Sequence, residues 1–431
     1  MVRRAGLLRG TVATRSARRW SRTVGMRSAG SADRARWSPA SRRGVRRPGT
    51  YAVGLLGGVV ILATGSAWAT LSAPMPRTRP TVPVGFTISK LAAAPAGTRS
   101  CDDLVFLEGH FFLGCQNKTL GGGGGGNSTL AEYTAAGALV TTWSIKDKID
   151  GLGADPLRHR VIVTENEDRN SYLLTVTPSA PAAHQIVRYS YSPNPSDANA
   201  PVALRTGGGT DQVSVDRAGH ILVTGSHART GRGTAVFKVV LSPPISPGGT
   251  GTAALSPTFA DNATATNGNT GTGTVKLNLR DIDSGAIVPK GSPRFGGSYV
   301  ITDQSANELV FSEHIFNGTG LTVLRTGFSL DDIRWATSAH GTLYVVDNGD
   351  MVAGASAIYK VTGPFKKNTV LASNDTIADQ VVTVNLTTGT LTPFVRHLTL
   401  TTGLVYLDPS GTQTELALNG VDNDGSDRAH G

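Results

Sequence analysis

The chain repeats one short pattern along most of its length: an acidic or small residue, an apolar strand, a turn and a second apolar strand. The clearest copies are DDLVFLEGHFFLGC from Asp102, DGLGADPLRHRVIVTEN from Asp150 and DQVSVDRAGHILVTGS from Asp211. Weaker copies start at Gly296, Asp331 and Thr402. Repetition at this scale is typical of a radial or solenoidal array, in which each unit buries its apolar face against its neighbours.

Each unit has sequence for about four short strands. LAEYTAAGALVTTW (130–143) follows the first hairpin and again reads as strand, Gly-containing turn and strand. Two hairpins make a four-stranded blade, so six starts predict an all-β, six-bladed β-propeller. The starts are unevenly spaced and the fourth unit is short, which leaves seven blades as the alternative. The propeller is expected to cover residues 85–420, after an N-terminal signal or anchor helix.

The two ends of this region suggest how the ring closes. The last unit ends near Gly420 after a single hairpin, so its blade lacks two outer strands. GFTISKLAAA, from Gly85, precedes the first unit and has no blade of its own. We predict that it joins the last blade and closes the ring, which removes open sheet edges. A plain extended linker is the alternative.

The N-terminal region carries the basic charge. Residues 1–50 hold 14 of the 41 Lys and Arg but only one of the 31 acids, Asp33. The rest of the chain therefore has 27 basic and 30 acidic residues, and the formal net charge of +10 describes this region rather than the propeller. A near-neutral domain with few aromatic residues argues against a nucleic-acid partner.

An apolar segment, residues 51–73, follows the basic region and is free of charged residues. Ala67-Trp68-Ala69 offers the small residues that a signal peptidase accepts. The segment is also long enough to span a bilayer once, so an uncleaved membrane anchor is the alternative to secretion after cleavage near Ala69. In both cases residues 1–50 stay cytoplasmic and the propeller is exported. Translation starting at Met26 would shorten the basic region, while 74–84 is read as a linker and 421–431 as a disordered tail.

The two cysteines, Cys101 and Cys115, bracket the first hairpin. If Glu108 and Gly109 form its turn, Cys101 falls within one residue of facing Cys115. That proximity and an oxidising compartment predict a disulfide that stabilises the first blade. A redox-active pair is the alternative, although the sequence has no CxxC motif.

Propeller geometry places the blade-start residues and the loops after the second strands on one face. We expect Asp103, Asp150, Asp211 and Asp332 to surround the channel mouth there. Converging carboxylates favour a hard cation such as Ca²⁺ or Mg²⁺. The alternative is a structural role, in which each Asp accepts backbone hydrogen bonds at its own turn. The other candidate residues of this binding face are Arg294, Glu165, Glu167, His227 and His314.

Four other histidines fall in the turns between first and second strands, on the opposite face: His110, His159, His220 and His340. Spread around a ring, they cannot supply the three or four convergent ligands of a zinc site. The sequence also lacks GxSxG, HExxH and P-loop motifs.

YVVDNG (344–349), the Gly-His turns and the Asp-led strands resemble six-bladed propellers of the gluconolactonase, NHL-repeat and YVTN-repeat superfamily. DDLVFLEGH, SPRFGG and WATSAHGTLYVVD more closely resemble an exported actinobacterial propeller family of unassigned activity. The resemblance covers about residues 100–410. Gluconolactonase-like enzymes hold a metal with a Glu, an Asn and an Asp at the channel mouth, whereas the first-blade residue here is Asp103.

Two functions follow from these observations. The first is a monomeric, non-catalytic exported propeller that binds an extracellular ligand or protein partner on its loop face. The second is a metal-dependent hydrolase or lactonase that uses the four aspartates. No catalytic residue is assigned, and no organic cofactor is expected.

Overall fold

The computed structural model describes residues 79–413, apart from 196, 198–199, 202–203, 205, 207, 227–232, 247, 350–353, 375–379 and 412. The regions interpreted above as basic region (1–50), apolar segment (51–73) and tail (421–431) lie outside the described residues. In the described part, no helix is long and apolar enough to cross a membrane.

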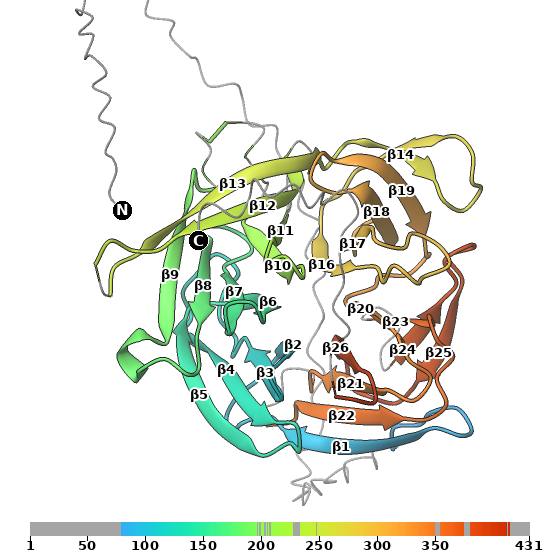
Figure 1. The fold of residues 1–431 in the computed structure, drawn as a ribbon, viewed down its shortest axis with the longest axis horizontal. Coiled ribbons are helices and arrows are strands. Elements are labelled where there is room, and N and C mark those ends of the chain that lie inside the picture. Colours follow the sequence, from blue (N-terminus) through green and yellow to red (C-terminus); the bar gives the residue numbers. More distant parts are fainter. Residues whose placement is uncertain are drawn as a thin grey trace, which may run out of the picture. The chain divides into compact units, whose positions relative to one another are not determined.

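Six antiparallel four-stranded blades surround a central channel (Figure 1), which confirms the all-β propeller. The innermost strands are β2 (Cys101–Leu107), β6 (Ile149–Asp155), β10 (Thr210–Val215), β16 (Ile282–Ile287), β20 (Ile333–Trp335) and β26 (Thr401–Leu407). The second strands are β3 (His110–Cys115), β7 (Arg160–Glu165), β11 (Ile221–Gly225), β17 (Tyr299–Asp303), β23 (Val370–Asn374) and β21 (Thr342–Asp347). The third strands are β4 (Asn127–Thr134), β8 (Tyr172–Val176), β12 (Thr234–Ser242), β18 (Glu308–His314), β24 (Gln380–Val384) and β22 (Ala357–Thr362). The outermost strands are β5 (Leu139–Lys146), β9 (Ile186–Ser192), β13 (Gly251–Ala260), β19 (Thr319–Arg325), β25 (Leu391–Val395) and β1 (Thr87–Ala93).

Three smaller elements lie outside the four-stranded blades. The short strands β14 (Thr264–Asn267) and β15 (Thr274–Lys276) extend the fourth blade beyond β19. A 3₁₀ turn, η1 (Ala182–His184), precedes β9. The outermost strands β13 and β9 pair in parallel, which joins the second and third blades into one eight-stranded sheet.

The hairpins form where the sequence combines apolar strands with residues suited to tight turns. Leu107 faces His110 across the β2–β3 turn, with Glu108 and Gly109 between them at φ values of 51° and 87°. Positive φ at both central residues is characteristic of the type I′ turn, whose twist matches that of the flanking strands. The predicted position of the first hairpin turn is therefore confirmed.

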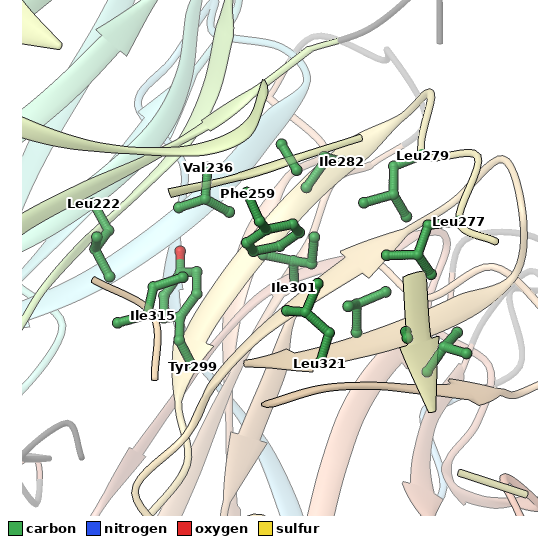
Figure 2. Packing of buried hydrophobic residues seen from close by; sticks show 14 of the residues in the cluster. Leu222, Val236, Phe259, Leu277, Leu279, Ile282, Tyr299, Ile301, Ile315 and Leu321 are labelled. Carbon is green, nitrogen blue, oxygen red and sulfur yellow. The ribbon is translucent and has the colours of Figure 1, made fainter. Parts of the chain in front are cut away.

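The hydrophobic core consists of separate clusters packed between neighbouring blades. In one cluster, Val236 and Phe259 of the third blade pack against Ile282, Tyr299 and Ile301 of the fourth (Figure 2). Burying one such side chain contributes about 1.5–3 kcal/mol relative to leaving it exposed. Because every blade packs its apolar faces against two neighbours, the innermost strands are held in a fixed arrangement around the channel.

The N-terminal strand closes the ring, as predicted. Strand β1 pairs antiparallel with β22, from Thr87 opposite Thr362 to Ala93 opposite Ala357. The innermost strand of the same blade is β26, the last strand of the described chain. Strands from both ends of the described chain thus meet in the sixth blade. The predicted second strand of the Thr402 hairpin falls largely on residues outside the described part.

The fifth and sixth blades exchange strands, so the predicted hairpin over 331–349 is wrong. Strand β20 pairs with β23, while β21 crosses to the sixth blade and pairs with β26 and β22. Packing decides these partners: Trp335 joins a cluster with Val370 and Ala372. Leu343 lies in a different cluster, with Leu404.

The fourth blade begins earlier than predicted. Its innermost strand is β16, which lies before the predicted start at Gly296, and the predicted first strand after Gly296 is the second strand, β17. The sequence IDSGAI has little apolar alternation because the inner strand has little room for side chains. A Cβ at Gly285 would overlap the Tyr299 hydroxyl group.

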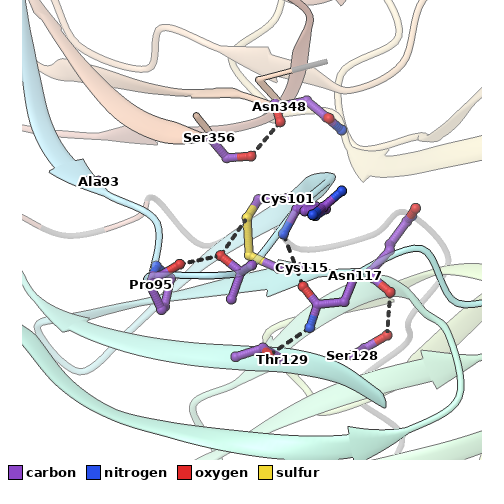
Figure 3. Close-up of a disulfide and its surroundings, with 12 residues drawn as sticks. Ala93, Pro95, Cys101, Cys115, Asn117, Ser128, Thr129, Asn348 and Ser356 are labelled. Carbon is purple, nitrogen blue, oxygen red and sulfur yellow. Dashed lines mark hydrogen bonds between the residues drawn. A yellow bond between two sulfur atoms is a disulfide. The ribbon is translucent and has the colours of Figure 1, made fainter. Parts of the chain in front are cut away.

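The predicted disulfide is confirmed. Cys101 on β2 faces Cys115 on β3, with an S–S distance of 2.02 Å (Figure 3). A β-bulge between Cys101 and Leu104 brings the two cysteines into register. Closing a loop of this length stabilises a domain by about 3 kcal/mol in the chain-entropy description.

Candidate functional site

The innermost strands place a ring of carboxyl groups at one end of the channel. Five blades each contribute one Asp from the start of the inner strand, and the loop after β7 adds Glu167. We name this set the acidic mouth; its acids are Asp102, Asp150, Glu167, Asp211, Asp283 and Asp331, and it includes Lys148. The sixth blade has Thr402 at the equivalent position of β26.

The tightest part of the acidic mouth is formed by Asp150, Glu167 and Asp211. One carboxylate oxygen from each lies within 4.8 Å of the other two. The Lys148 ammonium lies 2.7 Å from Asp150 Oδ1 and 2.5 Å from Glu167 Oε1. The Asp211 side chain is buried and accepts no hydrogen bond from any residue that the structure describes. Asp211 is therefore the carboxylate of this group with an open coordination position.

The surroundings of Asp150 and Asp211 oppose ionisation of these two carboxyl groups. Burial raises the pKa of Asp211 well above its usual value, and the neighbouring Asp283 and Asp150 raise it further. Burial also raises the pKa of Asp150, although the Lys148 ammonium partly offsets this effect. Carboxyl groups in this situation keep their protons to higher pH than usual unless a cation compensates their charge.

The opposite side of the acidic mouth repeats this arrangement. Burial raises the pKa of Asp331 well above its usual value, with contributions from the nearby Asp283 and Asp102. Gln116 Nε2 donates to Asp102 Oδ2 at 2.6 Å, and Gln304 Nε2 donates to Asp283 Oδ2 at 2.8 Å. These amides hold two of the carboxylates in position without neutralising them.

Asp103 and Asp332 lie one residue deeper along their strands and form a middle layer of the channel. Asp103 Oδ2 accepts hydrogen bonds from the Leu152 amide at 2.5 Å and from Gln212 Nε2 at 3.0 Å. Burial, followed by the charge of Asp332, raises the pKa of Asp103 to about 7. Its carboxylate thus links the first blade to the second and third.

Asp332 makes the corresponding contacts across the ring. Its Oδ1 accepts from Ser284 Oγ at 3.1 Å and from Arg334 Nη1 at 2.5 Å, while Oδ2 accepts from the Leu404 amide at 2.7 Å. Of the four aspartates expected to form one site, the structure brings Asp150 and Asp211 together. It places Asp103 and Asp332 in hydrogen bonds between blades.

The other predicted residues of the binding face divide into three groups. Glu167 belongs to the acidic mouth, whereas Glu165 is buried in an ion pair with Arg188 at 2.7 Å. Burial raises the pKa of Glu165 to about 7. His227 lies outside the described residues. Arg294 and His314 are on the opposite face from the acidic mouth, so their predicted placement is wrong.

The shifted start of the fourth blade explains this error. Arg294 follows β16 in the loop to the second strand, and His314 ends the third strand, β18. Arg294 donates to the carbonyl oxygens of Leu386 at 2.5 Å and Gly268 at 2.9 Å, and it therefore fixes loops rather than neutralising the acidic mouth.

Sequence reasoning missed Asp102, Asp283, Asp331 and Lys148. Two of the aspartates are the first members of Asp-Asp pairs, 102–103 and 331–332, whose second members we had chosen. Alignment of the inner strands could have identified the correct members. Asp150 and Asp211 align with Asp102 and Asp331, and the positions that align with Asp103 and Asp332 are Gly151 and Gln212.

Comparisons with known proteins give no relative at the level of sequence: no family model matches the chain, and no curated protein matches it. A protein of unknown function from Bacteroides caccae covers 71% of this chain and 86% of its own length, at 10% identity and a TM-score of 0.39. A protein from Lactobacillus plantarum covers 72% and 89%, at 10% identity and a TM-score of 0.37. The β-propeller domain of Cps50 (Swd1) from Myceliophteria thermophila covers 75% and 97%, at 8% identity and a TM-score of 0.41.

Proposed function

We propose that this chain is an exported, non-catalytic binding propeller whose ligand site is the acidic mouth, and that the ligand is a cation, in the first place Ca²⁺. One observation carries the proposal: carboxylate oxygens of Asp150, Glu167 and Asp211 converge within 4.8 Å of one another, and the Asp211 carboxylate accepts no hydrogen bond from a described residue. Buried carboxylates without such partners are costly unless a proton or a cation compensates them.

The spacing of the oxygens favours Ca²⁺ over Mg²⁺. Ca²⁺ binds oxygens at about 2.3–2.6 Å, so two ligands on opposite sides of one ion lie up to about 5 Å apart. Mg²⁺ requires about 2.0–2.1 Å and nearly octahedral geometry, which limits this separation to about 4 Å. A separation of up to 4.8 Å fits the larger ion without movement of the strands.

The charge count agrees with a divalent ion. Three ionised carboxylates and the Lys148 ammonium would carry a net charge of −2, which one Ca²⁺ neutralises. Lys148 occupies the side of the cluster between Asp150 and Glu167, so the ion is expected on the side of Asp211.

Elemental analysis and calorimetry of the purified full chain test the proposal. At a Ca²⁺ concentration of about one hundred times Kd, the folded state should gain about 2.7 kcal/mol, and EGTA should remove this gain. Asp211→Asn should abolish the response. Asp168→Asn, which removes the same charge from an exposed position of the neighbouring loop, should retain it. Failure of Ca²⁺ to bind the unaltered protein would rule out the proposed ligand.

Export is a separate part of the proposal. It is supported by the basic region, the apolar segment 51–73 and the disulfide, which forms in oxidising compartments. N-terminal sequencing of the protein from culture medium and from membranes distinguishes cleavage near Ala69 from a retained anchor. Recovery of the whole chain from the cytoplasm, with both cysteines reduced, would contradict export.

A second candidate function is metal-dependent hydrolysis, for example of a lactone, at the same three carboxylates. A metal held by these carboxylates would polarise a substrate carbonyl and activate a water molecule as the nucleophile. Turnover of simple lactones by the Ca²⁺-loaded protein, lost in Asp211→Asn and kept in Asp168→Asn, would favour this candidate. Binding of Ca²⁺ without turnover favours the non-catalytic function.

A further inference from the structure

The end of the channel opposite the acidic mouth contains a cavity of about 310 Å³. It lies among the ends of the innermost strands that surround the channel in Figure 1 and the turns that follow them. We name it the apolar cavity; residues that line it include Val105, Ala154, Val213, Val215, Arg334 and Trp335. Its volume is at the lower end of the range for small-molecule sites, which is about 300–1,000 Å³.

The walls of the apolar cavity are mostly hydrocarbon. The lining includes aliphatic side chains of four inner strands and the Trp335 ring. The acids at its rim have partners, because Glu108 contacts His159 and Asp216 Oδ2 lies 2.8 Å from His220 Nδ1. The rim therefore offers little attraction for a cation.

Arg334 provides a polar group inside this apolar lining. Its Nη1 donates to Asp332 Oδ1 at 2.5 Å and to the Ile333 carbonyl oxygen at 2.8 Å. Its Nε and Nη2 donate to no residue that the structure describes, although only 14% of the side chain is exposed. These two nitrogens, with three N–H groups, are thus available to a ligand in the apolar cavity.

The charges around Arg334 define the class of ligand. Asp332 already neutralises the guanidinium, and Asp103 lies close to both groups. A carboxylate ligand would be repelled by these two aspartates, and a cationic ligand would be repelled by the guanidinium. An uncharged acceptor oxygen can take the free Arg334 donors without either cost.

We propose that the apolar cavity is a second ligand site, for a small uncharged molecule with an apolar body and one hydrogen-bond-accepting oxygen that Arg334 binds. The body is buried against the inner strands, and the oxygen points toward the middle layer. The site is independent of the cation that we propose for the acidic mouth.

Fluorescence titration with Prodan, an uncharged naphthalene ketone, tests the site in the full chain. We expect saturable, blue-shifted emission with one probe per chain. Ala154→Phe or Val215→Phe should fill the cavity and weaken binding at least about tenfold, with folding checked by circular dichroism. Asp211→Asn should leave Prodan binding unchanged, which separates this site from the acidic mouth. No saturable binding, or binding unaffected by both filling variants, would overturn the proposal.

The role of Arg334 is tested with a pair of probes. Arg334→Met should weaken Prodan binding about tenfold, as expected for loss of a hydrogen bond to a charged donor. N-phenylnaphthylamine, an uncharged probe of similar size without the oxygen, should bind this variant within about twofold of the unaltered protein. Equal weakening of both probes would show that Arg334 only supports the cavity wall, and the proposed ligand class would then be wrong.

Discussion

The two ends of the channel are built from the same inner strands but have opposite chemistry. The first residues of these strands carry the acids of the acidic mouth, while residues near their other ends form the hydrocarbon walls of the apolar cavity. A strand therefore does not have one function. Its position along the channel axis decides whether a residue meets other carboxylates or packs against aliphatic side chains.

The middle layer separates these two environments. Asp103 and Asp332 use their oxygens to bind backbone amides of neighbouring blades, Leu152 and Leu404, rather than facing the acidic mouth. Each hydrogen bond crosses from one blade to another. The middle layer thus stabilises the ring where the channel changes from charged to apolar.

The largest effect should come from changing adjacent aspartates on either side of this boundary. Asp332→Asn removes the charge that pairs with Arg334 and replaces one of the two oxygens that accept from Arg334 and the Leu404 amide, so it should lower the free energy of unfolding by about 3–5 kcal/mol. Asp331→Asn removes one of several like charges and should be neutral or stabilising. Urea denaturation of both variants measures the difference. Similar losses of unfolding free energy in Asp332→Asn and Asp331→Asn would contradict the assignment of these two residues to different layers of the channel.

A smaller effect should appear in the dependence of stability on pH. In the unfolded chain these carboxyl groups titrate near pH 4, whereas burial raises the pKa of Asp150, Asp211 and Asp331 well above that value in the folded protein. The folded state then holds more protons in this range. The free energy of unfolding should therefore fall as pH rises from about 4 toward neutral.

Thermal unfolding without Ca²⁺ across this range measures the slope. A double variant, Asp211→Asn with Asp331→Asn, should have a shallower slope. Some slope should remain, because Glu165 and Glu308 lie outside the acidic mouth and burial raises the pKa of each to about 7. The cavity variant Ala154→Phe should keep the full slope. A stability that rises toward pH 7 would contradict the proposed protonation of the acidic mouth.

Much of the architecture could be predicted from local signals in the sequence. The Glu108-Gly109 turn, the facing cysteines and the unpaired strand after Gly85 each depend on short-range pattern or on simple counting of strands. The exchange between β20 and β21 could not be predicted, since both have suitable apolar residues and only packing between blades selects their partners.

The candidate site could be predicted only in part, because its layers differ by one residue. In the pairs 102–103 and 331–332 both positions are aspartate, so composition alone cannot say which carboxylate faces the acidic mouth. Asp283 was hidden for another reason. Its strand is rich in small residues, which the crowded channel requires and which resemble a loop in the sequence.

The smallest predicted effect concerns Lys148, the ammonium group that we identify within the acidic mouth. Its contacts with Asp150 and Glu167 compensate part of the charge that a Ca²⁺ ion would otherwise compensate. Lys148→Met should therefore destabilise the Ca²⁺-free protein but raise its Ca²⁺ affinity about tenfold, or about 1.4 kcal/mol, in isothermal titration. Lys146→Met, which removes an exposed charge nearby, should change the affinity much less. Weaker Ca²⁺ binding by Lys148→Met would show instead that the ammonium positions the carboxylates for the ion. Neither Lys148→Met nor Lys146→Met should alter Prodan binding at the other end of the channel.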